Sequence, residues 1–434
     1  MNREEVIEPL SDHILAGALS APASAEVINE APARFSPRME SSDLAQRIVA
    51  APQLSADHLA GLTSRFVSVP SVNGEHSERD LALVIAEELG SSGYQTTLVG
   101  AEARPSLAVT GGGDSEVLLN GHLDTVPVDD IDQWRFQPYA GVVTDGAVHG
   151  RGACDMKGGL AVQVAVAQWL AAESLGEGLV LHFAMGEERG EPGTESLIDA
   201  GFAAPIGIVL EPTDLRLGVA QRGLMTIRIT ILGRAGHASR PDLTDNPIER
   251  LPAVIGVIEA LEASPTSRHD LLGAPTWTTT VINSGVIPSM VPGRCEILVD
   301  RRMVPGETLD SVLAMIDRAL FEALPDDDIT VSVADEEGVY EPAEIPVDCA
   351  AVGLMSKSLE MFGESVDLFG TPYASDVRHL INAAGIEAVT FGPGRPTEMH
   401  ALDEFIEVDD LVRASRSVAA FSALALTYSV NSKK

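Results

Sequence analysis

Lysine is nearly absent from this chain of 434 residues. Only Lys157, Lys357, Lys433 and Lys434 occur, so arginine supplies most of the 29 basic residues. Against them stand 64 acidic residues, which gives a net charge of −35. A surface this acidic repels nucleic acid and anionic membranes, and we expect neither as a partner.

Cysteine and long apolar runs are scarce as well. The three cysteines, Cys154, Cys295 and Cys349, are odd in number and scattered, which argues against a disulfide framework. No run approaches the roughly 18 apolar residues that a membrane helix requires. The first residues have neither the basic nor the apolar region of a signal peptide. We therefore expect a cytoplasmic protein, and its length suggests two or three domains.

The pattern of expected helices and strands changes twice along the chain. An acidic, Ala- and Pro-rich leader over residues 1–52 is either a partly ordered arm or an extra helix. Residues 53–223 and 338–434 alternate as a mixed, largely parallel α/β sheet, the expected catalytic domain. Residues 224–337 follow the order βαββαβ, which predicts a small inserted domain of the ferredoxin-like type.

Histidines and acidic residues follow several expected strands of the larger domain. These strands cover residues 116–119, 179–183, 206–210 and 387–391, and open α/β sheets place their sites beyond such strand ends. Alone, each candidate has an ordinary alternative, such as a turn, a helix cap or a structural histidine. Their shared placement favours a metal centre. The candidates are His122, Asp124, Glu187, Glu188, Glu211 and His400, together with Asp155 in a Gly-rich loop that opens a helix.

The adjacent carboxylates Glu187-Glu188 repel each other unless positive charge lies nearby or both face water. Two imidazoles and three carboxylates suit zinc, and manganese or cobalt accept the same donors. We expect one or two divalent ions per subunit, with one glutamate as a ligand and its neighbour moving protons. Asp124 fits better behind His122, where it accepts the second ring N–H and fixes the tautomer.

Five motifs occur in series: Gly121-His122-Leu-Asp124, Gly150-Arg-Gly-Ala-Cys-Asp155-Met-Lys, Gly186-Glu187-Glu188, Glu211-Pro-Thr and Gly236-His237-Ala-Ser. From about residue 55 onward the chain resembles the M20 metallopeptidases, which include acetylornithine deacetylase, succinyl-diaminopimelate desuccinylase, aminoacylase and the carboxypeptidase G type. The resemblance implies that Asp155 bridges two ions. It places His122 and Glu211 at one ion, and Glu188 and His400 at the other. It also implies that Glu187 is the general base and that Asp124 lies behind His122.

The inserted domain has its own part in this resemblance. His237 would reach the active site of a partner subunit and help to hold the oxyanion. A homodimer would form through a helix and an edge strand of this domain, which would also act as a lid. From the residues alone, a turn histidine is an equal alternative for His237.

The substrate side departs from the family pattern. Ser289 stands where the family usually has Asn, and Met399 replaces the usual Ala before the last ligand. Arg301, Tyr373 and Arg378 lie in segments that the family retains, so an anionic substrate remains an expectation. We take all five as candidate substrate-binding residues.

Together these features predict a metal-dependent amidohydrolase. It would cleave the C–N bond of a small carboxylate-bearing substrate, such as an N-acyl amino acid, by a metal-activated water with Glu187 as general base. The altered small-domain loop and Met399 leave open a hydrolytic deaminase of an aromatic amine of the nitroanthranilate type. An inactive metal-binding relative is a further alternative, although such a relative has no use for Glu187.

Overall fold

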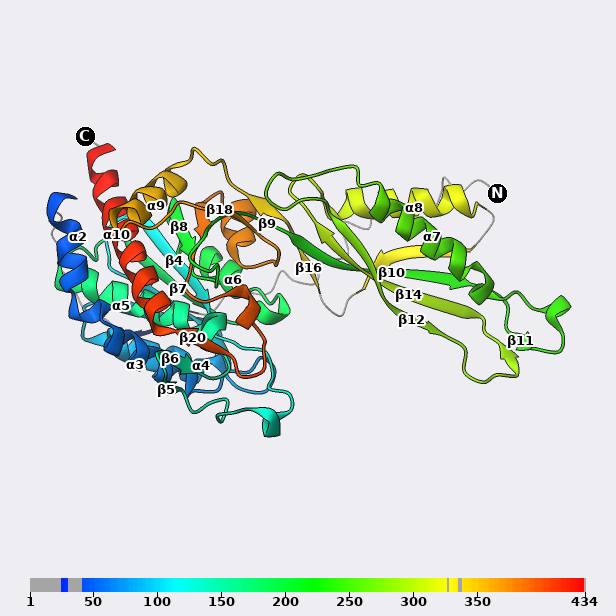
Figure 1. Ribbon diagram of the computed structural model, residues 1–434, viewed down its shortest axis with the longest axis horizontal. Helices are drawn as coiled ribbons and strands as arrows, with labels where there is room; N and C mark the ends of the chain where they lie inside the picture. Colours follow the sequence, from blue (N-terminus) through cyan, green and yellow to red (C-terminus); the bar gives the residue numbers. More distant parts are fainter. Residues whose placement is uncertain (1–24, 30–40, 326–327, 335–337, 433–434) are drawn as a thin grey trace.

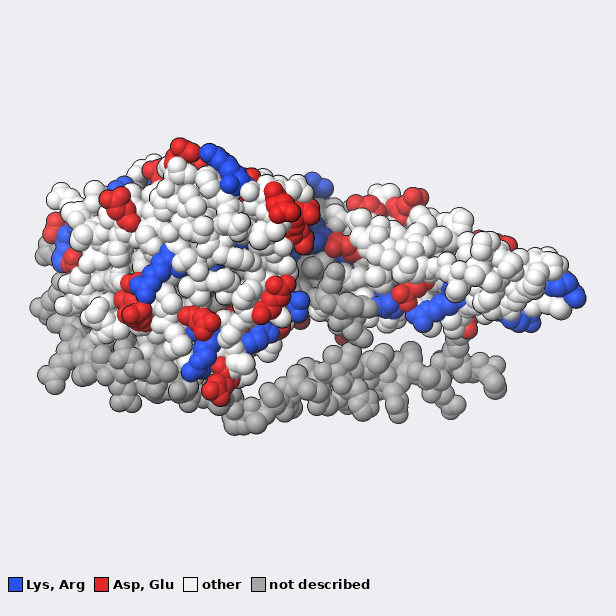
Figure 2. All heavy atoms as spheres, turned by 90° about the horizontal axis from the view of Figure 1, so that it is seen from below, with Lys and Arg blue, Asp and Glu red and all other residues white. Residues whose placement is uncertain are grey.

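The computed structural model describes residues 25–29, 41–325, 328–334 and 338–432. The chain forms a large body and a smaller, elongated one that extends from its side (Figure 1). Among the described residues, no helix is both long enough and apolar enough to cross a membrane. On the face drawn in Figure 2, acidic and basic side chains are interspersed over both bodies.

A ten-stranded mixed sheet forms the centre of the large body. Its strand order is β1-β2-β3-β7-β4-β8-β19-β9-β17, with β18 beside β9. The neighbours from β7 to β19 are parallel, whereas β1, β2, β3 and β17 pair antiparallel at the flanks. The predicted mixed α/β class is confirmed, and the parallel part is the centre of the sheet. The strands are β1 (Ala25–Asn29), β2 (Gln95–Ala101), β3 (Arg104–Thr110), β4 (Val117–His122), β7 (Leu179–Ala184), β8 (Ile206–Val209), β9 (Leu217–Gln221), β17 (Ala343–Glu344), β18 (Leu368–Thr371) and β19 (Glu387–Thr390).

Helices cover both faces of this sheet. Its central strands are buried on both sides: Val117 and Leu119 of β4 contact one core, and Leu118 contacts the other. The short helix α6 (Gly193–Asp199) packs on the second face through Leu197. The longer helices lie on the first face: α3 (Ala56–Val67), α4 (Glu78–Gly90), α5 (Gly158–Ala172), α9 (Ala350–Met361) and α10 (Val408–Ser432). The side chains of α5 are apolar around almost its whole circumference, mostly Ala, Val and Leu, which suits the burial of this helix among the others.

Part of the predicted leader is included in this body. β1 extends the sheet beyond β2, and α2 (Ser41–Ala50) contacts α10. The rest of the leader lies outside the described residues. The structure therefore provides an extra helix, one of the two alternatives, and an edge strand that the sequence pattern did not indicate.

The small body is an antiparallel sheet in the order β12-β14-β10-β15, with two helices on one face. Its strands are β10 (Gly223–Leu232), β12 (Thr276–Ser284), β14 (Arg294–Met303) and β15 (Ile329–Val333). The helices α7 (Leu251–Ala263) and α8 (Leu309–Ala323) bury Val254 and Ile316, among others, against it. Thr308 and Ser311 form a reciprocal cap at the start of α8. This arrangement confirms the βαββαβ, ferredoxin-like prediction.

A third, three-stranded sheet joins distant parts of the large body. β6 (Ala147–His149) pairs with both β5 (Val142–Thr144) and β20 (Phe405–Glu407). Strands of three residues give too little periodicity to predict. This sheet places the Gly-rich loop after β6 beside the segment that follows His400.

Candidate metal centre

Three of the five candidate ligands, His122, Glu188 and Glu211, lie at or just after the ends of the central parallel strands β4, β7 and β8. His122 ends β4, and the glutamate pair begins the turn η5 (Glu187–Arg189) that follows β7. Glu211 follows β8, and Asp155 lies in the turn η4 (Ala153–Lys157) at the start of α5. His400 follows the turn η9 (Pro396–Glu398).

These side chains lie in contact around Asp155. One carboxylate oxygen of Asp155 lies 3.1 Å from His122 Nε2, and the other lies 3.2 Å from His400 Nε2. His400 Nε2 is also 3.0 Å from Glu188 Oε2, while His122 Nε2 is 3.7 Å from Glu211 Oε1. Ligand atoms of His122, Asp155 and Glu188 all lie within 4.8 Å of one another, a spacing that suits a metal ion.

Asp124 has a contact that the sequence reasoning did not foresee. The nearest acceptor for His122 Nδ1 is the main-chain oxygen of Asp124, at 2.9 Å, whereas its carboxylate lies 3.7 Å away. That carboxylate instead accepts the main-chain N–H groups of Glu187 and Glu188, each at 3.1 Å. Asp124 therefore orients the ring through its backbone and fixes the glutamate turn through its side chain.

Asn73 supports the Asp124 carboxylate, a contact that we did not identify from the sequence. Its amide nitrogen donates to Asp124 Oδ2 at 2.8 Å, and its oxygen accepts from Arg104 at 3.2 Å. Arg104 in turn pairs with the buried Glu78. The residues around Asn73 are typical of a turn and do not indicate such a role, because its partners Asp124 and Arg104 are distant in the sequence.

The two neighbouring glutamates point to different surroundings. Gly186, with φ 75°, provides the left-handed turn before them, and a Cβ there would lie 2.5 Å from Glu191 Cβ. Glu188 contacts His400, as described above. Glu187 is 8% exposed, and its carboxylate has no hydrogen-bond or ion-pair partner among the described residues. One glutamate thus belongs to the ligand cluster and the other remains free.

Burial and mutual repulsion shift the titration of the glutamates. Burial raises the pKa of Glu187 and Glu211 well above the usual range, and nearby carboxylates add to the effect. Burial also raises the pKa of Glu188 to about 7, although His400 opposes this shift. The site therefore holds more buried negative charge than its own cations balance.

The pKa values of both histidines rise as well, and for an imidazole this shift favours the charged form. Burial lowers the pKa of His122, but Asp155 and Glu211 outweigh burial and raise it well above its usual value. Hydrogen bonds to Asp155 and Glu188 raise the pKa of His400 to about 10. Burial opposes the charge on Asp155, yet both histidines hold its pKa low. The carboxylates around the histidines therefore favour positive charge at this place, which is consistent with a site for cations.

Three of the predicted substrate-binding residues lie in the large body. Tyr373 donates its hydroxyl to the carbonyl of Pro212, next to Glu211, at 2.6 Å. Arg378 is buried, donates to the carbonyl of Ser375 at 2.9 Å and stacks on Tyr340 at 4.5 Å. Met399 is half-buried and directly precedes His400.

The other predicted substrate residues belong to the small body. Arg301 is fully buried in β14, pairs with Glu307 at 2.5 Å and stacks on Trp277 at 4.3 Å. This placement corrects the expectation that Arg301 offers its charge to a substrate, since Glu307 already balances that charge. Ser289 and His237 lie together at the far end of the small body, where β11 (Gly236–His237) pairs with β13 (Met290–Val291) (Figure 1).

Comparison with known proteins agrees with this fold and site. A sequence model of the peptidase family M20/M25/M40 matches residues 118–423, which include every candidate metal ligand. The chain therefore belongs to this family of metal-dependent hydrolases. This membership confirms the resemblance that the motifs indicated.

Several characterised relatives share much of the chain. An acetylornithine deacetylase of Myxococcus xanthus is 32% identical over 341 residues, which is 74% of this chain and 85% of the relative. A succinyl-diaminopimelate desuccinylase of Cereibacter sphaeroides is 29% identical, over 80% of this chain and 93% of its own. An N-formyl-4-amino-5-aminomethyl-2-methylpyrimidine deformylase of Halalkalibacterium halodurans is 26% identical, over 70% and 78%.

Solved structures share the two-body fold. A tripeptidase of Staphylococcus aureus superposes with a TM-score of 0.71 at 19% identity, covering 86% of this chain and 99% of its own. A dinuclear metal-binding M20 peptidase of Bacillus subtilis gives a TM-score of 0.64 at 16% identity, with coverages of 86% and 98%. These likenesses confirm the fold class.

Proposed function

We propose that this protein hydrolyses the acyl–nitrogen bond of a small, carboxylate-bearing substrate, with Glu187 as the general base. The observation that carries the proposal is the division of labour between the adjacent glutamates. Glu188 is in the ligand cluster, whereas Glu187 is buried beside it with a carboxylate that the described residues leave free.

The donor set fits divalent metal. His122, Asp155, Glu188, Glu211 and His400 supply two imidazoles and three carboxylates, and the opposed contacts of Asp155 suit a residue shared by two ions. When bound, such ions lower the pKa of a water and polarise the attacked group. Zinc is our first choice, and manganese or cobalt accept the same donors.

Glu187 provides the proton transfer that this reaction requires. Burial raises the pKa of its carboxyl group, so the group is a stronger base than an exposed glutamate when ionised. Asp124 holds the turn through the amides of both glutamates, which limits the positions that the Glu187 side chain can adopt. Glu187 would take a proton from water and later deliver it to the leaving nitrogen.

The acyl group remains to be chosen by experiment. The named relatives remove formyl, acetyl and succinyl groups, and all three are candidates here. Tyr373, Met399 and Arg378 would form the substrate side of the large body, with Arg378 facing a substrate carboxylate. Met399 beside His400 also suits a flat ring, so hydrolytic deamination of an aromatic amine is the second candidate.

We further propose that the small body works as a lid and as the contact of a homodimer. We assign it to residues 224–337, inserted between the two parts of the catalytic domain, 53–223 and 338–434. Strand β12 lies at the edge of its sheet and exposes Val281 (39%) and Ile282 (45%), a surface that a second copy can cover. Strand β11, which carries His237, lies far from the strands β4, β7 and β8 of the large body (Figure 1), so His237 and the neighbouring Ser289 would serve the partner's site. The cytoplasm is our proposed location.

A reconstitution assay tests the reaction. The protein is stripped with a chelator, reloaded with zinc or manganese, and offered formyl-, acetyl- and succinyl-amino acids beside aromatic amines. We expect turnover of at least one acyl substrate that disappears with the metal and returns on reloading. Release of ammonia from the aromatic amines alone would favour the deaminase, and metal binding without any turnover would favour the inactive relative.

Subunit mixing tests the dimer. His237→Ala and Glu187→Gln each disable one component, so the separate variants should be inactive. A mixed dimer contains one site with Glu187 from one chain and His237 from the other, and we expect activity to return on mixing. Continued inactivity of a mixture shown to form heterodimers would contradict the shared site.

A further inference from the structure

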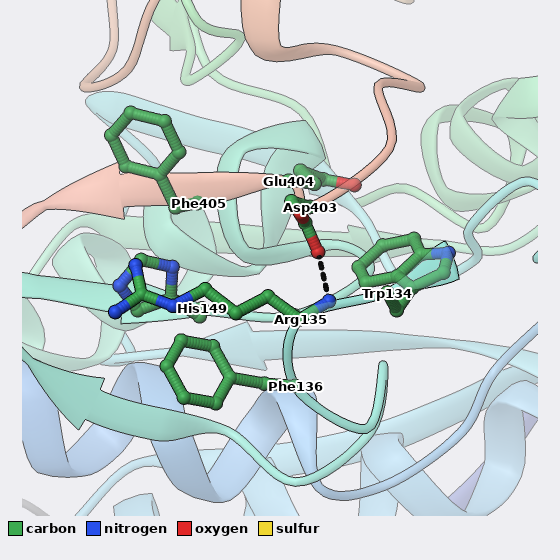
Figure 3. Close-up of a pocket in the computed structure, with 8 residues that line it drawn as sticks. Trp134, Arg135, Phe136, His149, Asp403, Glu404 and Phe405 are labelled. Carbon is green, nitrogen blue, oxygen red and sulfur yellow. Dashed lines mark hydrogen bonds between the residues drawn. The ribbon is translucent and has the colours of Figure 1, made fainter. Parts of the chain in front are cut away.

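A second pair of adjacent acidic residues lies close to the candidate metal centre, at Asp403 and Glu404. Their carboxylates have different partners. Asp403 accepts the main-chain N–H of Arg135 at 2.6 Å, on the outer side of the segment (Figure 3). Glu404 is 1% exposed and lies against the loop that carries Asp155.

Glu404 accepts four hydrogen bonds, all from one short stretch. Its Oε1 accepts the main-chain N–H groups of Cys154 and Asp155 at 2.9 and 3.0 Å. Its Oε2 accepts the N–H of Gly152 at 3.1 Å and Nη1 of Arg151 at 2.7 Å. The carboxylate therefore satisfies three buried amides of the Asp155 loop, and the Arg151 guanidinium balances its charge.

The segment before Glu404 carries His400, the second histidine that contacts the Asp155 carboxylate. His400 and Asp403 both have φ 59°, in the left-handed region, which His and Asp adopt more readily than most non-glycine residues. Two contacts hold the segment between them in place. Arg151 Nη1 also reaches the carbonyl of Ala401 at 3.4 Å, and the carbonyl of Glu404 accepts the N–H of Gly150 at 2.9 Å.

The strand that follows Glu404 also holds this segment against the large body. β20 pairs with β6, and Phe405 lies over His149 with ring centroids 5.7 Å apart. Both rings line a hollow of about 190 Å³ together with Trp134 and Phe136 (Figure 3). Glu404 thus connects two segments of the candidate metal centre: the loop 151–155, which carries Asp155, and the segment 400–404, which carries His400.

We propose that Glu404 is a positioning residue, which fixes Asp155 relative to His400 and so sets the affinity of the centre for metal. This inference rests on the proposed function only through the ligand roles of Asp155 and His400. Glu404 touches neither substrate nor ligand side chains. It acts through the amides of the Asp155 loop and through the chain that connects it to His400.

The test compares Glu404→Gln with Asp403→Asn. A glutamine at 404 keeps one acceptor oxygen, but its NH2 group faces donors that previously had an acceptor. Asparagine at 403 makes the same chemical change in the neighbouring residue, whose bond leads to Arg135 and not to the Asp155 loop. Three quantities are measured: zinc affinity by competition with a chelator, amide hydrogen exchange at residues 152–155 in the metal-free protein, and the urea midpoint.

We expect Glu404→Gln to weaken zinc binding by about 10- to 100-fold, the usual effect of removing a partner that supports metal ligands. Exchange should become at least about 10-fold faster at the amides that face the new NH2 group, which are Cys154 and Asp155 if it replaces Oε1, or Gly152 if it replaces Oε2. Asp403→Asn should change neither quantity by more than about 3-fold. A lower urea midpoint with unchanged zinc affinity of the folded protein would show a purely structural role and overturn the proposal.

The exchange measurement also separates this inference from the proposed reaction. It reads the hydrogen bonds of Glu404 without metal or substrate, so it remains decisive even if the zinc-loaded protein hydrolyses no acyl substrate. Unchanged exchange at all three of Gly152, Cys154 and Asp155 in Glu404→Gln would refute the positioning role, whatever the enzyme's activity.

Discussion

The side chain of Asp124 offers the sharpest test of how the glutamate turn is held. In Asp124→Asn, one amide group replaces a carboxylate that accepts from Glu187, Glu188 and Asn73. If the asparagine oxygen keeps the two bonds now made by Oδ2, its NH2 group faces the N–H of Glu187. A buried donor without an acceptor costs about 1–3 kcal/mol. That cost corresponds to about a 5- to 150-fold change in the local opening equilibrium.

Hydrogen exchange of the metal-free protein measures this change directly. We expect the Glu187 amide to exchange faster by that factor in Asp124→Asn. The bond from His122 to the main-chain oxygen of Asp124 should persist. Asp129→Asn is the matched control, because Asp129 is an exposed aspartate that follows the same strand. Unchanged exchange at both glutamates, together with a shifted His122 ring signal, would show that the carboxylate acts on the ring instead.

Three further outcomes follow from contacts away from the turn. Arg301→Met leaves Glu307 buried without its partner. Urea titration should therefore show that the free energy of unfolding falls by about 3–5 kcal/mol, while KM stays unchanged. A raised KM at full stability would instead assign Arg301 to substrate binding. Arg413→Gln removes the partner that lowers the pKa of Glu364, a half-exposed pair for which we expect about 0.5–1 kcal/mol at pH 7. The pKa of Glu364 is lower in the folded protein than in the unfolded chain. The stabilisation by the pair is therefore present above the unfolded pKa and is lost as pH falls through the folded pKa. A stability difference between Arg413→Gln and the wild type that persists at pH 2 would contradict the assignment. Zinc at about 100 times its dissociation constant should stabilise the metal-free protein by about 2.7 kcal/mol, and a melting temperature that does not respond to zinc would count against the site.

Much of the fold, and the gathering of the candidate ligands at one place, could be predicted because both depend on strong local patterns. Apolar strands of four or more residues end in polar ligands, and the parallel centre of the sheet brings those ends together. The β5–β6–β20 sheet could not be predicted, since three-residue strands have almost no periodicity. The acceptor roles of Asp124 and Glu404 depend on main-chain amides that are distant in the sequence, and no residue pattern records such contacts.

The alternation of residues along β14 already indicates that Arg301 is buried. Cys295, Ile297 and Val299 alternate along β14 on its buried face, and the same period of two places Arg301 on that face. A family motif favoured a substrate role, whereas the strand period favoured burial with a counter-charge. Glu307, six residues further on, provides that charge.

The proposed reaction requires that Glu188 holds metal while Glu187 moves the proton. Glu187→Gln tests it most directly, because the substitution keeps the size of the side chain and removes only its capacity as a base. Metal content and turnover are measured on the same zinc-loaded preparation. We expect wild-type metal content with turnover reduced by at least about 100-fold, the lower range for loss of a general base. Turnover near the wild-type rate, or loss of the metal itself, would contradict the division of roles between the two glutamates.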